Sequence, residues 1–429
     1  MPTARIESLD REGRGVVHAE GKVVFVDGAV PGEILEYASY RKKAAWEVAQ
    51  IVRIEKEGAA RVRPLCAFYG TCGGCSMQHL DMSTQVAAKQ RVLEDALWHI
   101  GRVRPETVLR AIHGLSWGYR HRARLSARFV IKKGGSLVGF RERKSSFVAD
   151  MTSCEVLPPR VSALLPALRA LVGGLTLRER LPQIEVAVGE NSIALVLRVL
   201  ESPGAGDEAQ LRNFADANGL QIWLQSAGPD SARLFWPPDA PALHYLLPEY
   251  AVQIGFSPTD FIQVNHATNR MLVHAALALL DPRAGETVSD YFCGLGNFTL
   301  PVGRCGAAAA GFEGSAALVA RAHANSVENG LADQCRFEVA DLFSSEICAR
   351  LPVCDKALLD PPREGAIELV KSFERTRPRR IVYVACDPAT LARDAEVLVH
   401  AQGYRLTSAG VVNMFPHTSH VESIACFER

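Results

Sequence analysis

A single cysteine lies at the end of an apolar, β-branched run in the segment YVACDPATLARD, residues 383–394. Cys386 stands where a buried strand is expected to stop, and the Asp-Pro pair after it begins a new element. A thiol at that position is either a small residue of the core or a nucleophile held up to a substrate. The other residues of the chain that could do chemistry distinguish between these two interpretations.

A second group of cysteines occurs in the segment CAFYGTCGGC. Cys66, Cys72 and Cys75 fall within ten residues, and Cys154, in MTSCEVL, follows much later in the chain. Four thiolates suit either a tetrahedral zinc ion or an iron–sulfur cluster. The spacing is not the paired two-residue pattern of a zinc ribbon, and a thioredoxin-like CGGC would need a strand that leads into a helix. The sequence therefore predicts a metal centre without choosing its metal.

A third candidate site is the segment VSDYFCGLGNFTLPVG, a predicted strand that runs into a glycine turn and then a helix. Gly294 and Gly296 let the backbone approach a ligand closely. A dinucleotide fingerprint would need a third glycine where the chain has Thr299, so a pyrophosphate cradle is not expected. Glu313 ends the next strand, where an acid commonly accepts hydrogen bonds from a ribose. These residues predict a nucleoside cofactor without a pyrophosphate, and S-adenosylmethionine is the commonest of these.

A carboxylate also ends the predicted strand in LLDPPREG, where Asp360 precedes two prolines. A carboxylate beside rigid prolines can orient a planar base or the amino group of a cofactor. A similar acid-Pro-Pro segment occurs in methyltransferases that act on the amino groups of bases. Asp360 by itself therefore leaves two chemistries open.

Positive charge is concentrated between residues 102 and 144. This stretch has twelve lysines and arginines against two glutamates, a local net charge of +10, whereas the whole chain has a net charge of +1. Four aromatic residues are interleaved with these charges: Trp117, Tyr119, Phe129 and Phe140. A basic strip with aromatic side chains suits a phosphate backbone with unstacked bases, so we predict contact with nucleic acid. The alternative is a solvated face of a strand-rich domain.

The elements that must position these residues change in character twice along the chain. Residues 1–57 are typical of a small β-barrel that binds oligonucleotides, because about five short strands are broken there by glycines. Residues 58–250 hold the first cysteines, the basic strip and a helix with Ser83 as its cap, and they predict an α+β domain. In residues 251–429 strand and helix signals alternate, as in a Rossmann-like α/β domain with a doubly wound, mostly parallel sheet.

The composition agrees with a multidomain soluble protein. The chain has 429 residues, of which 48% are hydrophobic and 22% charged, enough for about three domains. Its polar start is no signal peptide, and its longest apolar stretch, MLVHAALALL, is too short to cross a bilayer. We therefore expect no membrane contact and a cytoplasmic location. Eleven cysteines in a reducing compartment indicate metal ligands rather than disulfides.

The order of the motifs resembles the RNA uracil-5-methyltransferase family over nearly the whole chain. The matching segments are CGGC, DFIQVN, FCGLGNFTLP, LLDPPR, YVACDPATLARD and MFPHTSHVES. The segment GRGVVHAEGKVVFVDGAVPGE resembles a TRAM domain, an RNA-binding barrel with an OB-like fold. A TRAM domain together with a cysteine cluster is similar to the branch that modifies 23S ribosomal RNA, since the transfer-RNA members look different and lack both. No obligate protein partner is predicted, and we expect a monomer.

The resemblance implies a role for each candidate residue. Cys386 matches the nucleophile, and Glu422, in SHVES, matches the base. Four cysteines match the ligands of a [4Fe–4S] cluster: Cys66, Cys72, Cys75 and Cys154. Six residues fall on positions that surround S-adenosylmethionine: Gln263, Phe292, Asn297, Glu313, Asp341 and Asp360.

The implied reaction explains why a thiol and a carboxylate are both required. Carbon-5 of uracil is a poor nucleophile until a thiolate adds to carbon-6 and makes carbon-5 enolate-like. After methyl transfer, a base removes the carbon-5 proton and the cysteine leaves. The uridine must be out of any base stack, because its ring atoms cannot be reached inside one.

One departure from the family pattern lies beside the nucleophile. Family members usually carry Ser-Cys-Asn-Pro where this chain has Ala-Cys-Asp-Pro, so Asp387 replaces an asparagine. An ionised acid close to Cys386 would raise the pKa of the thiol and slow its attack. An aspartate that caps the following helix would have little effect, and we predict that Asp387 is such a cap.

Other functions are compatible with parts of the sequence. Methyl transfer to an exocyclic amino group would use LLDPPR and would not need Cys386. A non-catalytic RNA-binding or iron–sulfur sensing protein would not need Cys386, Glu422 and Glu313 to be intact. Formation of 5-methyluridine in transfer RNA, or at another ribosomal site, is a further alternative, because no residue reads as a specificity contact.

Overall fold

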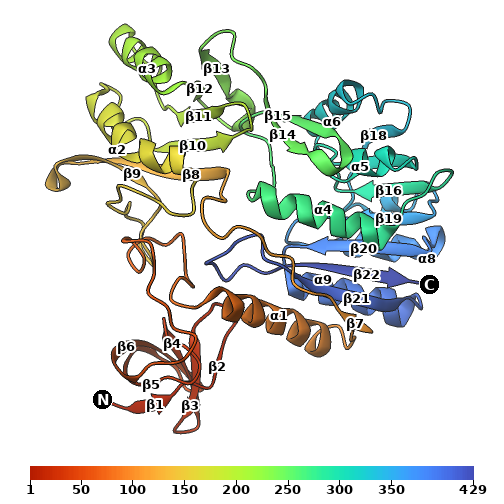
Figure 1. Ribbon diagram of the computed structural model, residues 1–429, viewed down its shortest axis with the longest axis horizontal. Helices are drawn as coiled ribbons and strands as arrows, with labels where there is room; N and C mark the ends of the chain where they lie inside the picture. The colour runs from red at the N-terminus through yellow and green to blue at the C-terminus, as the bar shows by residue number, and fades with distance from the viewer.

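The computed structural model describes all residues, 1–429, and contains four β-sheets (Figure 1). The first sheet has six strands in the order β1-β5-β6-β4-β3-β2, antiparallel except for the parallel pair β4 and β6. Alternate residues of these strands, among them Val24, Val26 and Leu35, meet in one small core. The strands are β1 (Thr3–Arg5), β2 (Ser8–Leu9), β3 (Gly15–Ala19), β4 (Lys22–Asp27), β5 (Ile34–Lys42) and β6 (Trp46–Lys56).

The second sheet lies in the central part of the chain and has the order β13-β12-β11-β10-β8-β9. Only β11 and β12 are parallel neighbours. Helix α2 packs on its apolar face through Val161, Leu165 and Leu168, which lie in one buried cluster with the strand residues. Its strands are β8 (Arg122–Val130), β9 (Gly135–Gly139), β10 (Gln183–Val188), β11 (Ile193–Arg198), β12 (Gln221–Gln225) and β13 (Arg233–Trp236). Its helices are α2 (Pro159–Gly174) and α3 (Ala205–Asn218), with short 3-10 turns at Ile131–Lys133 and Pro229–Ser231.

The largest sheet has eight strands in the order β18-β17-β16-β19-β20-β22-β21-β7. The five strands from β18 to β20 are parallel, as the alternating pattern predicts, but the sheet as a whole is mixed because β22 runs antiparallel to both β20 and β21. Its strands are β7 (Thr107–Val108), β16 (Thr287–Tyr291), β17 (Ala308–Glu313), β18 (Cys335–Val339), β19 (Lys356–Leu359), β20 (Arg380–Ala385), β21 (Arg405–Val412) and β22 (Glu422–Glu428). A separate hairpin, β14 (Leu243–Leu247) and β15 (Val252–Phe256), follows the central sheet, with a 3-10 turn at Pro248–Tyr250.

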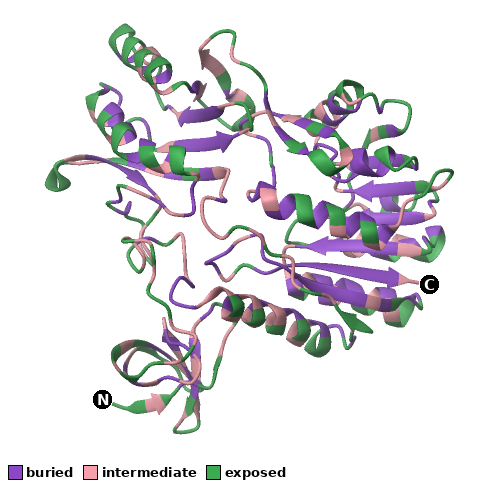
Figure 2. Ribbon diagram, viewed as in Figure 1, coloured by how far each residue is buried: buried purple, intermediate pink, exposed green.

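Helices cover both faces of the parallel strands, and this explains the unbroken apolar run in β20. Ile381 and Tyr383 face one buried cluster, whereas Val382 and Val384 face another on the opposite side. Figure 2 shows buried strands lying between helices whose outer faces are exposed. The helices are α1 (Met82–His99), α4 (His266–Leu280), α5 (Thr299–Arg304), α6 (Ala316–Glu328), α7 (Ser345–Cys348), α8 (Ile367–Thr376) and α9 (Pro388–Glu396), the last continued by a π-helical turn at Val397–Ala401.

Helix α1 packs on the C-terminal sheet although it precedes the central sheet in the chain. It contacts α9 and β21, and β7 adds a parallel strand at the edge beside β21 (Figure 1). Leu93, Leu97 and Val103 are buried in the same cluster as residues of β19 and β20. The segment around α1 therefore packs as part of the C-terminal domain.

Two helix caps test the sequence predictions. The cap of α1 is Asp81, whose carboxylate accepts a hydrogen bond from the Thr84 amide at 3.0 Å, so the prediction of Ser83 is wrong. Ser83 lies in the first turn and donates its hydroxyl to Asp81, which is the stronger acceptor. Asp387 does cap α9, accepting from the Ala389 amide at 2.8 Å. None of the helices is long and apolar enough to span a bilayer.

Candidate active site

The parallel strands of the C-terminal sheet end at a cavity of about 1200 Å³. Each strand from β16 to β20 contributes a residue at or just after its carboxyl end, in the order Phe292, Glu313, Asp341, Asp360 and Cys386. Open α/β sheets bind their ligands at this edge. The cavity is therefore the candidate active site.

All twelve candidate residues of the sequence line this one cavity. The cysteines of the CGGC segment and Cys154 reach it from the central region, and the others reach it from residues 263 to 422. The twelve are Cys66, Cys72, Cys75, Cys154, Gln263, Phe292, Asn297, Glu313, Asp341, Asp360, Cys386 and Glu422.

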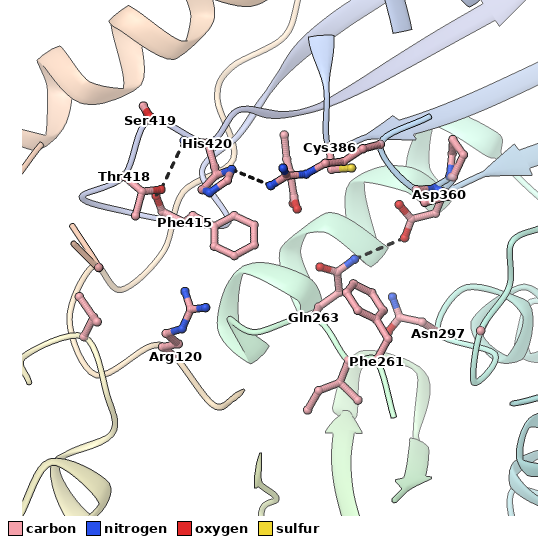
Figure 3. A pocket seen from close by; sticks show the side chains of 18 of the residues that line it. Arg120, Phe261, Gln263, Asn297, Asp360, Cys386, Phe415, Thr418, Ser419 and His420 are labelled. Carbon is pink, nitrogen blue, oxygen red and sulfur yellow. Dashed lines mark hydrogen bonds between the residues drawn. The ribbon is translucent and has the colours of Figure 1, made fainter. Parts of the chain in front are cut away.

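Cys386 and Glu422 are brought together by strand pairing. Cys386 follows the last residue of β20, and Glu422 is the first residue of the antiparallel neighbour β22. Ala385 pairs with Ser423, so the two functional side chains lie at the same end of adjacent strands. Figure 3 shows Cys386 on the same side of the cavity as Asp360, which follows the other neighbour of β20. A thiol thus has a carboxylate on each side.

Burial sets the protonation of this group. It raises the pKa of the Cys386 thiol to about 11, with further increases from Glu422 and Asp360, and Arg363 opposes the shift. It also raises the pKa of Glu422 to about 8, helped by Asp360. Because the thiol is protonated at neutral pH, its proton must leave before it can attack, and the carboxylates beside it are the available acceptors.

Asp360 is held by a side chain from the segment before α4. The Gln263 amide donates a hydrogen bond to the Asp360 carboxylate at 3.3 Å (Figure 3). Burial raises the pKa of Asp360 to about 7, and this hydrogen bond opposes the shift. Asp360 can therefore present either a carboxylate or a carboxylic acid to a ligand near neutral pH.

The glycine turn after β16 and the acid at the end of β17 are joined directly. The Gly294 amide donates to Glu313 at 3.2 Å, and the Ser315 amide donates to the same carboxylate at 2.9 Å. Gly294 and Gly296 have φ of 54° and 89°, the left-handed region that glycine adopts without strain. The carboxylate of Glu313 is thus fixed at the cavity edge, where it can accept a hydrogen bond from a ribose.

An aromatic pair, a hydrogen bond to a backbone amide and a pair of asparagine side chains complete the end of the cavity near Glu313. The rings of Phe292 and Phe343 lie 5.6 Å apart, and the Asp341 carboxylate accepts from the Phe343 amide at 3.0 Å. The Asn297 side chain exchanges hydrogen bonds with that of Asn269 at 2.9 and 3.0 Å. An apolar plane bordered by fixed polar groups suits an adenine ring.

The four cysteines are free thiols on the wall of the same cavity. Burial raises the pKa of Cys75 to about 11 and that of Cys154 to about 12. Charge repulsion from neighbouring cysteines of the group also raises both pKa values. No three histidine, cysteine or acidic side chains in the chain lie close enough together to hold a single metal ion.

Several cavity residues escape prediction from the sequence. Arg363, Phe415 and His420 line the cavity, and Arg363 is 3.4 Å from the His420 ring. The ring of His417 is stacked on that of Trp117, a residue of the basic strip, with the ring centres 3.8 Å apart. The buried Lys89 lies behind the cavity, and its only sequence signal is a charge on the apolar face of a predicted helix.

The family model described as tRNA (Uracil-5-)-methyltransferase matches residues 249–429. A protein of Nitrosospira multiformis, named 23S rRNA (uracil(1939)-C(5))-methyltransferase RlmD, is 60% identical over 99% of this chain and 98% of its own length. The protein of the same name from Thiobacillus denitrificans is 60% identical over the full length of both chains. The chain belongs to the 23S rRNA (uracil-C5)-methyltransferase family. This family membership agrees with the motif resemblance.

A solved structure supports the fold. The tRNA (uracil-54, C5)-methyltransferase of Pyrococcus abyssi, in complex with S-adenosyl-L-homocysteine, matches 99% of this chain and 99% of its own with a TM-score of 0.76. At 24% identity this likeness shows the fold alone. The C-terminal part therefore has the fold of an S-adenosylmethionine-dependent methyltransferase, as members of the 23S rRNA (uracil-C5)-methyltransferase family are expected to have.

Proposed function

We propose that the protein transfers a methyl group from S-adenosylmethionine to carbon-5 of a uridine in 23S ribosomal RNA. The observation that carries the proposal is that Cys386 and Glu422 lie at the same end of the paired strands β20 and β22, in the cavity that Glu313 and Asp360 also line. A thiol and a base at adjacent strand ends are the two groups that carbon-5 methylation needs. The full-length relatives named for this reaction support the same choice.

In the proposed mechanism, the Cys386 thiol gives its proton to the Asp360 carboxylate, so that Glu422 stays ionised, and the sulfur adds to carbon-6 of the uracil. S-adenosylmethionine, when bound, supplies an electrophilic methyl group for carbon-5. Glu422 then accepts the carbon-5 proton, and the carbon-6–sulfur bond breaks as the ring double bond returns. Asp360, held by Gln263, orients the cofactor or the base.

The cofactor is assigned to the end of the cavity lined by Phe292, Asn297, Glu313 and Asp341. We expect Glu313→Ala to weaken S-adenosylhomocysteine binding by about 10- to 100-fold, because a hydrogen bond to a charged group contributes about 1.5–3 kcal/mol. Isothermal titration calorimetry checks this result. The matched control is Glu338→Ala, an exposed acid on the adjacent strand β18, which should leave the affinity unchanged. Equal affinities for the two variants would contradict the assignment of Glu313.

The proposed domains are a TRAM β-barrel at 1–57, a central domain at 58–250 and the catalytic domain at 251–429. The basic strip supports an RNA role for the central domain, because Arg124, Arg141 and Lys144 line a groove that shares Phe140 with the cavity. A strand of RNA in this groove would lead into the active site.

We also propose that the four cysteines hold a [4Fe–4S] cluster. Four free thiols, two buried and two half-buried, line one cavity and suit the four cysteine ligands of such a cluster. Bound iron would supply the positive charge that lets these thiols ionise. We further propose that the protein is a monomer, and a ribosomal RNA substrate supports action in the cytoplasm.

Replacing one ligand tests the cluster. We expect Cys75→Ala, purified without oxygen, to lose its iron, its sulfide and its visible absorbance, and to melt at a lower temperature than the parent. Cys305→Ala removes an exposed cysteine outside the cavity and should retain all three properties. Iron content that is the same in both variants, or zinc in place of iron, would show that the cluster assignment is wrong.

Nucleoside analysis tests the proposed reaction. Unmodified 23S and transfer-RNA transcripts are incubated with the iron-containing protein and S-adenosylmethionine, digested and measured by mass spectrometry. We expect 5-methyluridine in 23S RNA only. An N-methylated base would favour transfer to an exocyclic amino group, and 5-methyluridine in transfer RNA alone would favour the other branch of the family.

A further inference from the structure

A lysine is buried behind the active site without an ion-pair partner. The side chain of Lys89, on α1, is 1% exposed, and no carboxylate lies within 4 Å of its ammonium group. It donates hydrogen bonds to the Asn413 side chain at 2.7 Å and to the carbonyl oxygen of Phe415 at 2.8 Å. A buried ammonium group is costly, so its retention at this place needs a reason.

The acceptors of Lys89 lie next to the proposed base. Val412, the last residue of β21, pairs with Glu422, and Asn413 follows it directly. Phe415, two residues further, lines the active-site cavity. The Glu422 side chain has one carboxylate oxygen that is buried and accepts no hydrogen bond. A buried carboxylate without donors needs a nearby positive charge to ionise.

We propose that Lys89 is a positioning residue of the reaction, which ties the segment 413–415 to α1 and supplies the positive charge that favours the ionised form of Glu422. This inference rests on the proposed function, because it assumes that Glu422 is the base. Lys89 touches neither substrate nor cofactor in this account. It acts through Glu422 and through the backbone that carries Phe415.

The charges around Glu422 determine how its pKa is expected to change when Lys89 is removed. Asp360, from the end of β19, raises the pKa of Glu422, and Lys89 is the one charge that lowers it. Cys386 is protonated near neutral pH and contributes no charge there, and Arg363 acts on that thiol. Without Lys89, burial and Asp360 act on Glu422 unopposed, so its pKa rises above about 8.

The titratable groups that face Lys89 do not reverse this expected rise in the pKa of Glu422. Glu422 favours the charged form of Lys89, but burial lowers the pKa of Lys89 to about 7, so its positive charge acts on Glu422 most strongly below about pH 7. Burial also lowers the pKa of His417 to about 4 and lowers that of His420. Both imidazoles are therefore neutral above pH 7, where Glu422 titrates.

The experiment measures turnover against pH for Lys89→Met, whose unbranched side chain fills the same space. A base works in its ionised form, so turnover of the parent rises as the pH rises toward about 8. This rising part of the pH profile is called its limb below. In Lys89→Met we expect this limb to move up by less than one pH unit, with a loss of about 3-fold at pH 7, where Lys89 is about half charged, that disappears at pH 9. More of the methylated RNA–protein adduct should also survive denaturation at pH 7, because removal of the carbon-5 proton is slowed.

The matched control is Gln85→Ala, one turn earlier on the same face of α1. Gln85 is buried and anchors the same loop through a neutral contact, accepting from the His417 amide at 2.8 Å. We expect it to lower turnover equally at all pH values, without moving the limb. Lys89→Arg keeps the charge and should restore the parent profile, and Lys89→Gln replaces the methionine variant if that variant does not fold.

The outcomes separate this inference from the proposed function. An active parent whose limb moves in Lys89→Met but not in Lys89→Arg or Gln85→Ala supports the role of Lys89. An active parent with the same limb in all variants overturns that role and leaves the proposed function intact. A parent that forms no 5-methyluridine overturns both.

Discussion

Cys386→Ala is expected to abolish 5-methyluridine formation, with a loss of about 10⁴-fold or more in turnover. Without the thiol nothing adds to carbon-6, so carbon-5 never becomes nucleophilic enough to take the methyl group. The Cys386 side chain lies beyond the end of β20 and not in the core, so its removal should leave the fold stable. Mass-spectrometric nucleoside analysis of 23S RNA checks the result.

Two controls make this loss specific. Cys386→Ala should bind S-adenosylhomocysteine as tightly as the parent, because the residues assigned to the cofactor lie at other strand ends. Cys305→Ala, an exposed cysteine outside the cavity, should be fully active. Methylation that survives in Cys386→Ala would make this cysteine a bystander, and Asp360 with its two prolines would then indicate transfer to an amino group.

Glu422→Gln is expected to stop the reaction one step later. The thiol can still add and the methyl group can still be transferred, but no base accepts the carbon-5 proton, so the RNA stays bonded to Cys386. We expect turnover to fall by about 10²- to 10⁴-fold, the usual contribution of a general base. A denaturing gel should show a methyl-labelled RNA–protein band that the parent lacks.

The matched control for this variant is Asp360→Asn on the other side of the thiol. Asp360 is assigned to orientation and to deprotonation of the thiol, and not to removal of the carbon-5 proton, so its amide variant should slow methyl transfer without accumulating the labelled band. If the labelled band accumulated in Asp360→Asn and not in Glu422→Gln, Asp360 would be the base for the carbon-5 proton and Glu422 the orienting residue. Normal turnover in Glu422→Gln would exclude Glu422 as the base.

The strand-end residues could be predicted because the parallel strands have strong local signals. Glu313, Asp360 and Cys386 each follow an apolar run that ends abruptly, and such runs are typical of strands buried on both faces. The helix cap at Asp387 was predictable for the same reason, since it depends on neighbours in the sequence. The edge of the sheet where they meet then follows from the fold class.

The remaining features depend on contacts between distant segments. Nothing local shows that β22 inserts antiparallel between β20 and β21, although this register places Glu422 beside Cys386. Likewise, α1 reads as an ordinary amphipathic helix, and only its packing against β21 reveals that Lys89 bonds to residue 413. The roles of Glu422 and of the cysteines come from family resemblance, because spacing alone cannot tell which groups a fold brings together.

The most direct test is a reaction with 23S RNA that carries 5-fluorouridine. Fluorine at carbon-5 cannot be removed as a proton, so a thiol that has added to carbon-6 stays attached after methyl transfer. We expect a stable adduct, and peptide mapping by tandem mass spectrometry should place a methylated fluorouridine on Cys386. No adduct, or an adduct on another residue, would contradict carbon-5 methylation through Cys386.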